Sequence, residues 1–367
     1  MNFHMSKKQV VCHRMILGLL LLTGAALFMW AQSFLYNASA SEPLQSGYDL
    51  PNAHQRPYYT YYQECCYYIP NHFPLVGIDD IVFTPPAPPP EHREPFRPTI
   101  TAAYIQRLMS FDYLVSNIFL VDRYTALFPS DIDTYAFLQS DLRIDTTVTG
   151  PQVLIFHTHS QERFVGSNPL DPMSGVVGVG RILADILEDT YGIRVLHNTD
   201  QFDVVDGRPR RQGSYERMEP VIRQVLADNP SIQMVLDLHR DGVRDGAGPF
   251  ITYIDNQRTA RIMFFNGLSR QNRGGQITAV PWLPNPYQRE NLNFTFQLQL
   301  AANQLYPGFA RRAYLREFRY SLHMMPMSMF VEVGNQYNTF PEAARAMEPL
   351  ASIIATVILG GPPEQIK

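Results

Sequence analysis

Histidine and glutamate side chains stand at the ends of apolar segments, in a pattern that suits a zinc ion. The segment V-L-I-F-H-T-H-S-Q-E, Val153 to Glu162, ends with His159 and Glu162 three residues apart. This spacing places two side chains on the same side of a turn or of a first helical turn. His239 ends a later apolar segment, V-L-D-L-H, and supplies a third group. Two histidines, one glutamate and an open fourth position form a hydrolytic zinc site, and zinc lowers the pKa of a bound water to about 7.

A further carboxylate can act as the base that such a site needs. Glu332 lies in the apolar segment M-F-V-E-V-G-N, Met329 to Asn335. A carboxylate in an apolar strand is costly unless it is paired or functional. We therefore expect Glu332 to take the proton from the zinc-activated water and to pass it to the leaving amine. The alternative is a structural salt bridge between Glu332 and a buried arginine.

Residues next to the expected ligands have supporting roles, with alternatives that stay open. His157 lies two residues before His159, and on a regular strand both would face the same side. His157 can therefore orient the site, bind substrate or replace His159 as the ligand. Asp237 and Asp241 bracket His239, and one of them is expected to hold the free ring nitrogen of that histidine. The alternative for each aspartate is an ordinary solvated or salt-bridged side chain.

Three more polar residues are weaker candidates for a role in the site. Arg240 can clamp a substrate carboxylate, or it can pair with Asp241. His323 precedes the segment that holds Glu332 and can stabilise an oxyanion, or it has a simple packing or surface role. His197 follows a predicted strand and is expected to be a loop histidine.

The elements that would position these residues alternate between strands and helices. Short apolar runs rich in β-forming residues predict strands, and Gly192 is a natural C-terminal cap for the helix before it. After the strand at Val153, the predicted strands are 193–196, 232–238, 250–254, 261–265 and 327–333, and the predicted helices are 176–191, 214–228, 294–305 and 341–359. This alternation predicts an α/β fold with a mostly parallel sheet and helices on both faces. Ligands and catalytic groups gather at the carboxyl ends of the strands in such sheets.

The N-terminal part of the chain predicts export across a membrane. Residues 1–14 include three Lys and Arg side chains, and residues 15–35 hold an uncharged and mostly apolar run. Positive charge before such a run predicts a transmembrane anchor or a signal segment whose basic end stays in the cytoplasm. Both alternatives stay open, because Ala38-Ser39-Ala40 offers a small-residue cleavage site. In either case the rest of the chain is expected outside the cytoplasm.

Three further regions complete the predicted organisation. Residues 36–98 are rich in tyrosine and proline and predict an extracytoplasmic linker with an extended spacer. Residues 99–150 predict a small helical lead-in, and residues 151–367 predict the zinc hydrolase domain. A chain of 367 residues, 45% of them hydrophobic, has room for one large domain beside these appendages.

The charge and the cysteines make two classes of protein poor fits to the sequence. The formal net charge is -4 and no long run of Lys and Arg occurs, so we expect no nucleic-acid partner. The chain has three cysteines, and two of them, Cys65 and Cys66, are adjacent. Neighbouring cysteines are a poor start for a disulfide framework, so none is expected.

Six motifs, in this order along the chain, resemble stage II sporulation protein P, a family of cell-wall hydrolases in spore-forming bacteria. They are I-F-H-T-H-S-Q-E (155–162), V-G-V-G-R-I-L (177–183), Y-G-I-R-V-L-H (191–197), D-L-H-R-D (237–241), Y-P-G-F (306–309) and F-V-E-V-G-N-Q-Y-N-T (330–339). The last motif is also similar to the catalytic-glutamate strand of zinc-dependent N-acetylmuramoyl-L-alanine amidases. The chain departs from the family at 320–322, where Y-S-L stands in place of an aromatic-Asn-Gln run, and this departure bears on local substrate contacts.

The resemblance implies an amidase that cuts the bond between muramic acid and the first residue of the peptide stem. It also implies an endopeptidase action on peptide cross-links, a location at the cell membrane facing the cell wall, and the partners stage II sporulation proteins D and M during engulfment of the forespore. Two other functions stay open. One is a zinc carboxypeptidase, which shares H-x-x-E and a later histidine, and the other is an envelope binding module that has lost the metal.

Overall fold

The computed structural model describes residues 99–360 and 364–366 of the chain. The predicted membrane or signal segment, the Tyr/Pro-rich linker and all three cysteines lie outside these residues.

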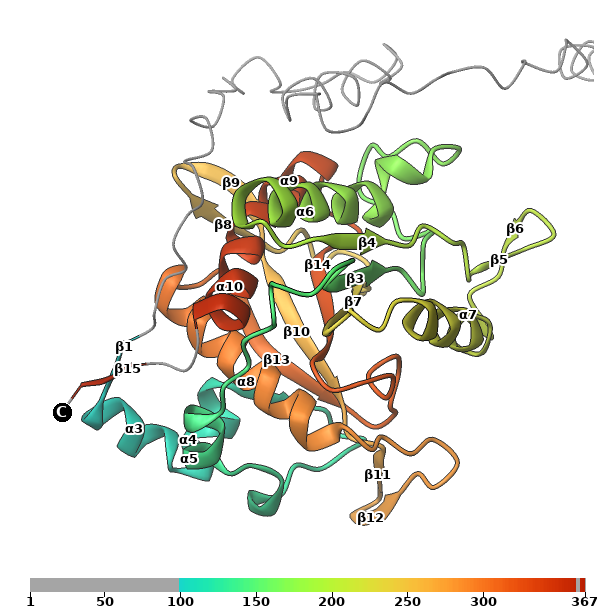
Figure 1. The fold of residues 1–367 in the computed structure, drawn as a ribbon. Helices are drawn as coiled ribbons and strands as arrows, with labels where there is room; N and C mark the ends of the chain where they lie inside the picture. The colour runs from blue at the N-terminus through green and yellow to red at the C-terminus, as the bar shows by residue number, and fades with distance from the viewer. Residues whose placement is uncertain (1–98, 361–363, 367) are drawn as a thin grey trace, which may run out of the picture. The chain divides into compact units, whose positions relative to one another are not determined.

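A seven-stranded sheet forms the centre of the described structure (Figure 1). Its strands, in spatial order, are β2 (Phe119–Val121), β13 (Ala310–Arg316), β10 (Ile262–Gly267), β14 (Ser328–Asn335), β7 (Met234–Asp241), β3 (Val153–Phe156) and β4 (Val195–His197). Five of the six neighbouring pairs are parallel, and only β10 and β14 run in opposite directions. The predicted mostly parallel sheet is confirmed.

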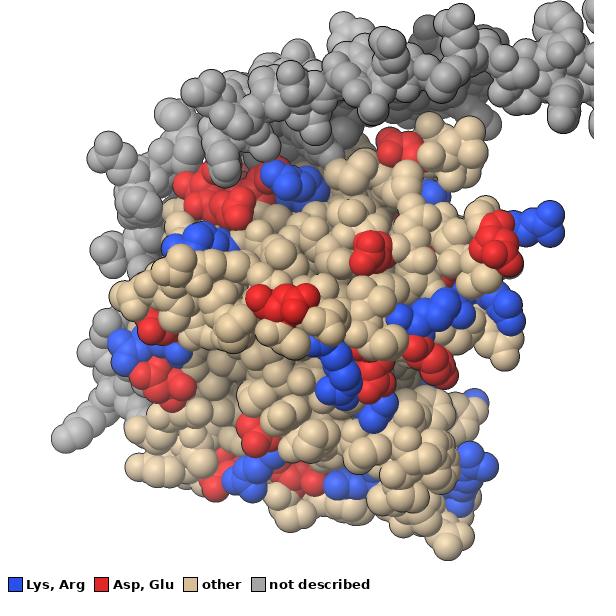
Figure 2. Space-filling view, turned by 45° about the vertical axis from the view of Figure 1, so that its right-hand side comes forward, with Lys and Arg blue, Asp and Glu red and all other residues tan. Residues whose placement is uncertain are grey.

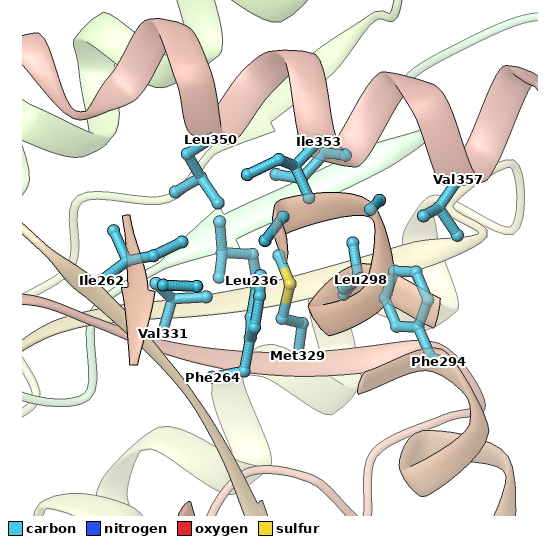
Figure 3. Packing of buried hydrophobic residues seen from close by; sticks show 14 of the residues in the cluster. Leu236, Ile262, Phe264, Phe294, Leu298, Met329, Val331, Leu350, Ile353 and Val357 are labelled. Atoms are coloured by element: carbon cyan, nitrogen blue, oxygen red, sulfur yellow. The ribbon is translucent and has the colours of Figure 1, made fainter. Parts of the chain in front are cut away.

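Helices α6 (Val176–Tyr191), α8 (Gln288–Leu305) and α10 (Met347–Gly360) cover one face of the sheet. Figure 3 shows Leu350 and Ile353 of α10 directed toward strand residues such as Leu236 and Val331. These side chains belong to one buried apolar cluster, and burial of a Leu or Ile side chain contributes about 1.5–3 kcal/mol to folding. This cluster fixes the three helices on the sheet.

Helix α7 (Ser214–Asp228) covers part of the opposite face. Its Met218 and Ile222 pack with Leu154 of β3 and Val235 of β7 in a second buried cluster. Because successive strand residues point to opposite faces, β7 sends Leu236 to the large cluster and Val235 to this one. The prediction of helices on both faces is therefore confirmed.

Glycines in the left-handed region define the C-terminal end of α6 and the N-terminal end of α7. Gly192 ends α6 in the left-handed region with φ 66°, and its N–H donates to the Glu188 and Leu187 carbonyls. The predicted helix 214–228 is confirmed, with Ser214 as its first residue, and its N-cap is Gly213 at φ 77°. A glycine at this position adopts the positive φ without a steric cost.

The lead-in contains β1 (Thr99–Thr101), α3 (Ala102–Leu108), α4 (Phe111–Asn117), the strand β2, the 3-10 turn η2 (Pro129–Asp131) and α5 (Thr134–Gln139). Side chains of Thr101, Ser110 and Asp133 cap the three helices. Strand β2 pairs with β13, so the lead-in supplies an edge strand of the sheet in addition to helices. Strand β15 (Glu364–Ile366) pairs with β1.

The remaining elements are short, and one of them differs from the sequence prediction. They are the hairpins β5–β6 (Val204–Val205, Arg208–Pro209), β8–β9 (Ile251–Ile254, Gln257–Ala260) and β11–β12 (Arg270–Arg273, Gln276–Ala279), with η3 (Pro172–Ser174) and α9 (Phe340–Arg345). The segment predicted at 250–254 forms a separate hairpin and is not a strand of the sheet. The sheet strand β13 had not been predicted, because arginines interrupt its sequence A-R-R-A-Y-L-R.

One described helical stretch, Phe340–Gly360, is long and apolar enough to cross a membrane. Of its most apolar window, 78% is buried inside the structure. Its buried residues, Leu350 and Ile354 among them, belong to the large apolar cluster. This stretch is therefore a core element of the fold.

Candidate metal centre

The candidate site lies where β3, β7 and β14 run in parallel toward the same edge of the sheet. His239 belongs to β7 and Glu332 to β14, and the two residues are paired in register. His159 and Glu162 follow the end of β3 at Phe156. The chain thus brings the expected ligands together from segments that are about 80 residues apart in sequence, by the adjacency of parallel strands.

One ligand atom from each of His159, Glu162 and His239 lies within 4.8 Å of the other two. His159 Nδ1 is 3.6 Å from Glu162 Oε1, and His239 Nδ1 is 3.2 Å from Glu162 Oε2. Two ligand atoms bound to one tetrahedral zinc ion, each at about 2.1 Å, lie about 3.4 Å apart. His159 Nδ1 is buried and has no hydrogen-bond partner. The spacing, the donor types and this unpartnered nitrogen all fit a zinc ion.

Asp237 fixes the ring of His239. Its Oδ1 lies 2.6 Å from His239 Nε2, so that nitrogen carries a proton and donates it, which leaves Nδ1 to face Glu162. Asp237 also accepts hydrogen bonds from the N–H and the hydroxyl of Thr158. The His239 ring stacks on Phe330 with ring centroids 4.2 Å apart. The nitrogen that faces Glu162 is therefore held in place from several sides, as metal-binding histidines usually are.

Both oxygens of Glu162 have partners that orient the carboxylate. The backbone N–H of Arg240 donates to Oε2 at 2.9 Å. The guanidinium of Arg211 donates to Oε1, also at 2.9 Å. A buried carboxylate needs such hydrogen bonds to offset the loss of water.

The surroundings shift the pKa values of the three groups in different directions. Burial lowers the pKa of His159 to about 3, and the charge of His239 adds to this effect, so His159 is neutral. Burial also lowers the pKa of His239, but Asp237 and Glu162 outweigh it and raise the value to about 10. Burial raises the pKa of Glu162, yet the charge and the hydrogen bond of His239 bring it below its ordinary value. A metal cation that replaced the proton on His239 Nδ1 would face the Glu162 carboxylate, while Asp237 would keep its hydrogen bond to Nε2.

Glu332 has an unusual carboxyl group beside these residues. Its Oε2 is buried and has no hydrogen-bond partner, although the residue as a whole is only partly buried. Burial raises the pKa of Glu332 well above its ordinary value, and the charge of Glu162 adds to the rise. In the part of the chain that the structure describes, no arginine forms a salt bridge with Glu332. A carboxyl group in this state suits proton transfer near neutral pH.

His157 does not join the three groups. Its Nδ1 donates to the Leu238 carbonyl at 2.9 Å, and its Nε2 lies 2.9 Å from Nε2 of His197. Strand β3 ends at Phe156, so the regular alternation that would place His157 and His159 on one side does not continue to His159. His197 is the last residue of β4, and the expectation of a loop position was wrong.

Three other predicted residues have structural partners. Arg240 Nε donates to the Arg163 carbonyl at 3.0 Å, and its Nη1 donates to the backbone carbonyl of Asp241, so it is bound to backbone and not to a carboxylate. The Asp241 carboxylate pairs with Arg311 at 2.6 Å. His323 donates from Nδ1 to the Tyr320 carbonyl at 3.0 Å, and its Nε2 lies 3.1 Å from Glu219 of α7.

The sequence analysis missed Arg211, Asp203 and Tyr215. Asp203 accepts hydrogen bonds from the Ser160 hydroxyl at 2.6 Å and the Gln161 N–H at 3.0 Å, the two residues between His159 and Glu162. The ring of Tyr215 packs edge-on against His159, 5.4 Å away between centroids. These residues lie on surface loops or at a helix start, where no hydrophobic pattern marks them.

The chain matches a known protein family over most of the residues that the structure describes. The model of the family Stage II sporulation protein P (SpoIIP) matches residues 123–355. The chain belongs to this family. The family that the six motifs predicted is thereby confirmed.

A curated relative is Stage II sporulation protein P of Bacillus subtilis (strain 168), which is 23% identical over 235 residues. The match covers 59% of this chain and 53% of the relative, so the chain spans about half the length of that protein. Among solved structures, the CwlD amidase from Clostridioides difficile in complex with the GerS lipoprotein is 10% identical at a TM-score of 0.35, with 56% of this chain and 98% of that chain covered. The N-acetylmuramoyl-L-alanine amidase AmiC2 of Nostoc punctiforme is 16% identical at a TM-score of 0.33, with 58% and 98% covered.

Proposed function

We propose that this member of the stage II sporulation protein P family is a zinc-dependent hydrolase of peptidoglycan. Its main reaction is that of an N-acetylmuramoyl-L-alanine amidase, and cleavage of peptide cross-links is a second action. The observation that carries the proposal is the placement of His159, Glu162 and His239 at ligand spacing beside the unpaired carboxyl of Glu332. Family membership supports a role in sporulation.

His159, Glu162 and His239 would hold the zinc ion, with Asp237 and the Arg240 N–H fixing two of these ligands. A zinc ion held there would supply a Lewis acid that polarises the scissile carbonyl and makes water nucleophilic near neutral pH. The three protein groups leave one position open for water or substrate, which separates a catalytic from a structural zinc site.

Glu332 moves the proton in this reaction. As a carboxylate it accepts a proton from the attacking water, which forms a bond to the lactyl carbonyl carbon of muramic acid. It then donates that proton to the nitrogen of L-alanine as the C–N bond breaks. The products are the free carboxylate on muramic acid and a peptide with a free amino terminus. Because burial raises the pKa of Glu332, the side chain can both accept and return the proton near neutral pH.

The proposal extends to location and partners. The basic residues 1–14 and the apolar residues 15–35 would hold the protein at the membrane as a single-pass anchor or deliver it as a signal segment. The catalytic domain would face the cell wall, where its substrate lies. Stage II sporulation proteins D and M are the proposed partners during engulfment.

The test combines metal content with the products from purified peptidoglycan, using the full chain. We expect about one zinc per chain and release of intact peptides that begin with a free L-alanine. Glu332→Gln keeps the shape of the side chain and should lower the rate by about 10²–10⁴-fold without loss of zinc. Glu216→Gln changes an exposed glutamate of α7 and is the matched control, with no change expected.

Other products would decide against the amidase. Release of single C-terminal residues from free peptides would favour the carboxypeptidase. A protein that binds no zinc and forms no product would favour the binding module. Full activity of Glu332→Gln would contradict the proposed proton transfer.

A further inference from the structure

An arginine-rich loop borders the candidate metal centre. Residues 206–213, D-G-R-P-R-R-Q-G, run from the turn of the small hairpin β5–β6 through its second strand to helix α7 and carry Arg208, Arg210 and Arg211. All three side chains are exposed. The blue atoms of Figure 2 are arginine throughout, because the three lysines lie outside the described residues, and across the face shown they are mixed with acidic side chains.

This loop is tied to the segment that carries the proposed ligands. Asp203 binds Ser160 and Gln161 through its carboxylate, and its carbonyl accepts the Arg210 N–H at 2.6 Å. A single residue therefore connects the arginine loop to the turn between His159 and Glu162. A displacement of the loop would strain the metal centre, so the two are held as one unit.

Arg217, in the first turn of α7, fixes the loop backbone from the other side. Its guanidinium donates to the carbonyls of Phe202 at 2.6 Å, Arg210 at 2.6 Å and Gln212 at 3.1 Å. Three bonds from one planar group to three carbonyls define the path of the loop. The loop is preorganised, which lowers the entropy cost of binding a ligand there.

Arg211 reaches from this loop into the site. Its side chain is 64% exposed, yet its Nη1 lies 2.9 Å from Oε1 of Glu162, which is 3% exposed. The guanidinium therefore stands at the boundary between solvent and the buried ligands. A guanidinium has five N–H donors in a fixed fork, and this contact occupies one side of it.

The other two arginines lack acidic partners. Within residues 99–360, neither Arg208 nor Arg210 forms an ion pair, whereas Arg223 and Arg319 on and near α7 both pair with Glu219. Exposed guanidinium groups without a carboxylate partner, next to a site, favour an anionic ligand, and Arg binds carboxylates in a two-pronged geometry.

The position fits a particular part of a peptide stem. Extended residues span about 3.5 Å each, so an α-carboxylate on the second stem residue lies about 7 Å from the scissile carbonyl. Glu162 Oε1 would lie about 2 Å from the metal, and the Arg211 guanidinium begins 2.9 Å beyond it. The free donors of Arg211 are thus at the distance of the first or second stem residue.

We propose that Arg211, with Arg210 beside it on the same loop, binds a free carboxylate of the peptide stem within two residues of the scissile bond. The inference rests on the proposed function, and it makes Arg211 a specificity-determining residue that prefers stems with a free α-carboxylate to stems in which that group is an amide.

A purely structural role for Arg211 is the rival explanation, in which it only orients Glu162. That role would weaken zinc binding on substitution and would affect every substrate alike. Recognition of a stem carboxylate adds an effect that is confined to ligands carrying the carboxylate, beside the contribution of Arg211 to the orientation of Glu162. A pair of ligands that differ in this single group separates the two roles.

The test measures binding by calorimetry to zinc-loaded full chain carrying Glu332→Gln, so that no turnover is required. The probes are N-acetylmuramoyl-L-alanyl-D-glutamate and N-acetylmuramoyl-L-alanyl-D-isoglutamine, which differ only at the α-carboxyl of the second residue. We expect the acid to bind at least about tenfold more tightly than the amide, the lower range for a charge-assisted contact. In zinc-saturated protein, addition of Arg211→Gln should remove this difference, while Arg208→Gln, on the hairpin, should preserve it.

Three results would overturn the inference. They are an unchanged acid preference in Arg211→Gln, an equal loss for both probes in that variant, and no binding of either probe by the Glu332→Gln protein. Hydrolysis of the same two compounds by the wild-type chain is measured separately. An acid preference without hydrolysis would leave this inference standing and reject the proposed amidase, and hydrolysis without preference would do the reverse.

Discussion

His157 and His159 are two residues apart in sequence and both are buried, but they differ in their hydrogen-bond partners. His157 is completely buried, and both of its nitrogens are satisfied by the Leu238 carbonyl and by His197. His159 is nearly as buried, but its Nδ1 has no hydrogen-bond partner and lies 3.6 Å from Glu162 Oε1, and its ring packs edge-on against His239. Two histidine pairs therefore flank the end of β3. We call His157 and His197 the closed pair, because they bond to each other, and His159 and His239 the incomplete pair, because His159 Nδ1 lacks a partner.

The chemical difference lies in what surrounds each pair. Burial lowers the pKa of both His157, to about 4, and His197, so the closed pair consists of two neutral rings that share a proton donor and an acceptor. The incomplete pair is bordered by Asp237 and Glu162, whose negative charges need a cation. Carboxylates that accept from or face a histidine ring are what make the second pair the candidate metal centre.

The largest expected effect is a loss of zinc affinity on substitution in the incomplete pair but not in the closed pair. His239→Ala removes a ligand and should weaken zinc binding by more than the roughly 10–100-fold typical of changes around a ligand. His197→Ala removes one ring of the closed pair and should leave zinc affinity unchanged. Competition with a chromophoric chelator measures both, and comparable losses in the two variants would refute the distinction.

Asp237→Asn tests the support of the incomplete pair. The variant loses the negative charge that holds Nε2–H of His239 and should weaken zinc binding by about 10–100-fold. Asp241→Asn is the matched control, since Asp241 pairs with Arg311 instead, and its zinc affinity should not change. Equal effects of the two substitutions would show that Asp237 acts only through general charge.

The pH dependence of zinc uptake should also come from the incomplete pair. With the pKa of His239 raised to about 10, its Nδ1 carries a proton at neutral pH that must leave before the nitrogen can bind. Affinity should therefore fall by about tenfold for each unit of decreasing pH between about pH 9 and 7. A histidine with an ordinary pKa of about 6.5 would give nearly constant affinity in that range. Constant affinity there would show that Asp237 and Glu162 do not hold a proton on His239.

Gly180→Ala should have the smallest effect on zinc and an effect on stability instead. An added Cβ would lie 2.5 Å from Cε1 and 2.6 Å from Nε2 of His157, which is too close for a buried ring that cannot move. We expect a loss of about 1–3 kcal/mol in the free energy of unfolding. Gly242→Ala, whose Cβ would meet only Arg240 Nη1 at 3.9 Å, is the control. Denaturant unfolding checks both, and a large change in zinc affinity in Gly180→Ala would couple the two pairs.

The sequence predicted the parts of the site that lie on apolar strands. His239 and Glu332 could be placed because each stands in or at the end of a continuous apolar run that reads as a buried strand, and parallel strands bring such ends together. The sheet and the helices α6 and α7 followed from the same patterns.

Other parts depend on tertiary contacts that no local pattern reports. The sequence left the role of His157 open, because β3 ends at Phe156 and the next residues leave the strand geometry that would relate it to His159. Strand β13 was missed because arginines interrupt its apolar pattern. The partners of these arginines, such as Asp241 for Arg311, are brought close only by the folded chain. Arg211 and Asp203 lie in the irregular segments after and before the hairpin β5–β6, where sequence spacing from Glu162 carries no information about contact.

An anomalous difference map at the zinc absorption edge, from a zinc-loaded crystal, tests the central claim most directly. The account predicts one peak within about 2.2 Å of a nitrogen of His159, an oxygen of Glu162 and Nδ1 of His239. A peak at His157 and His197, or a zinc-loaded crystal without a peak among the three proposed ligands, would contradict it.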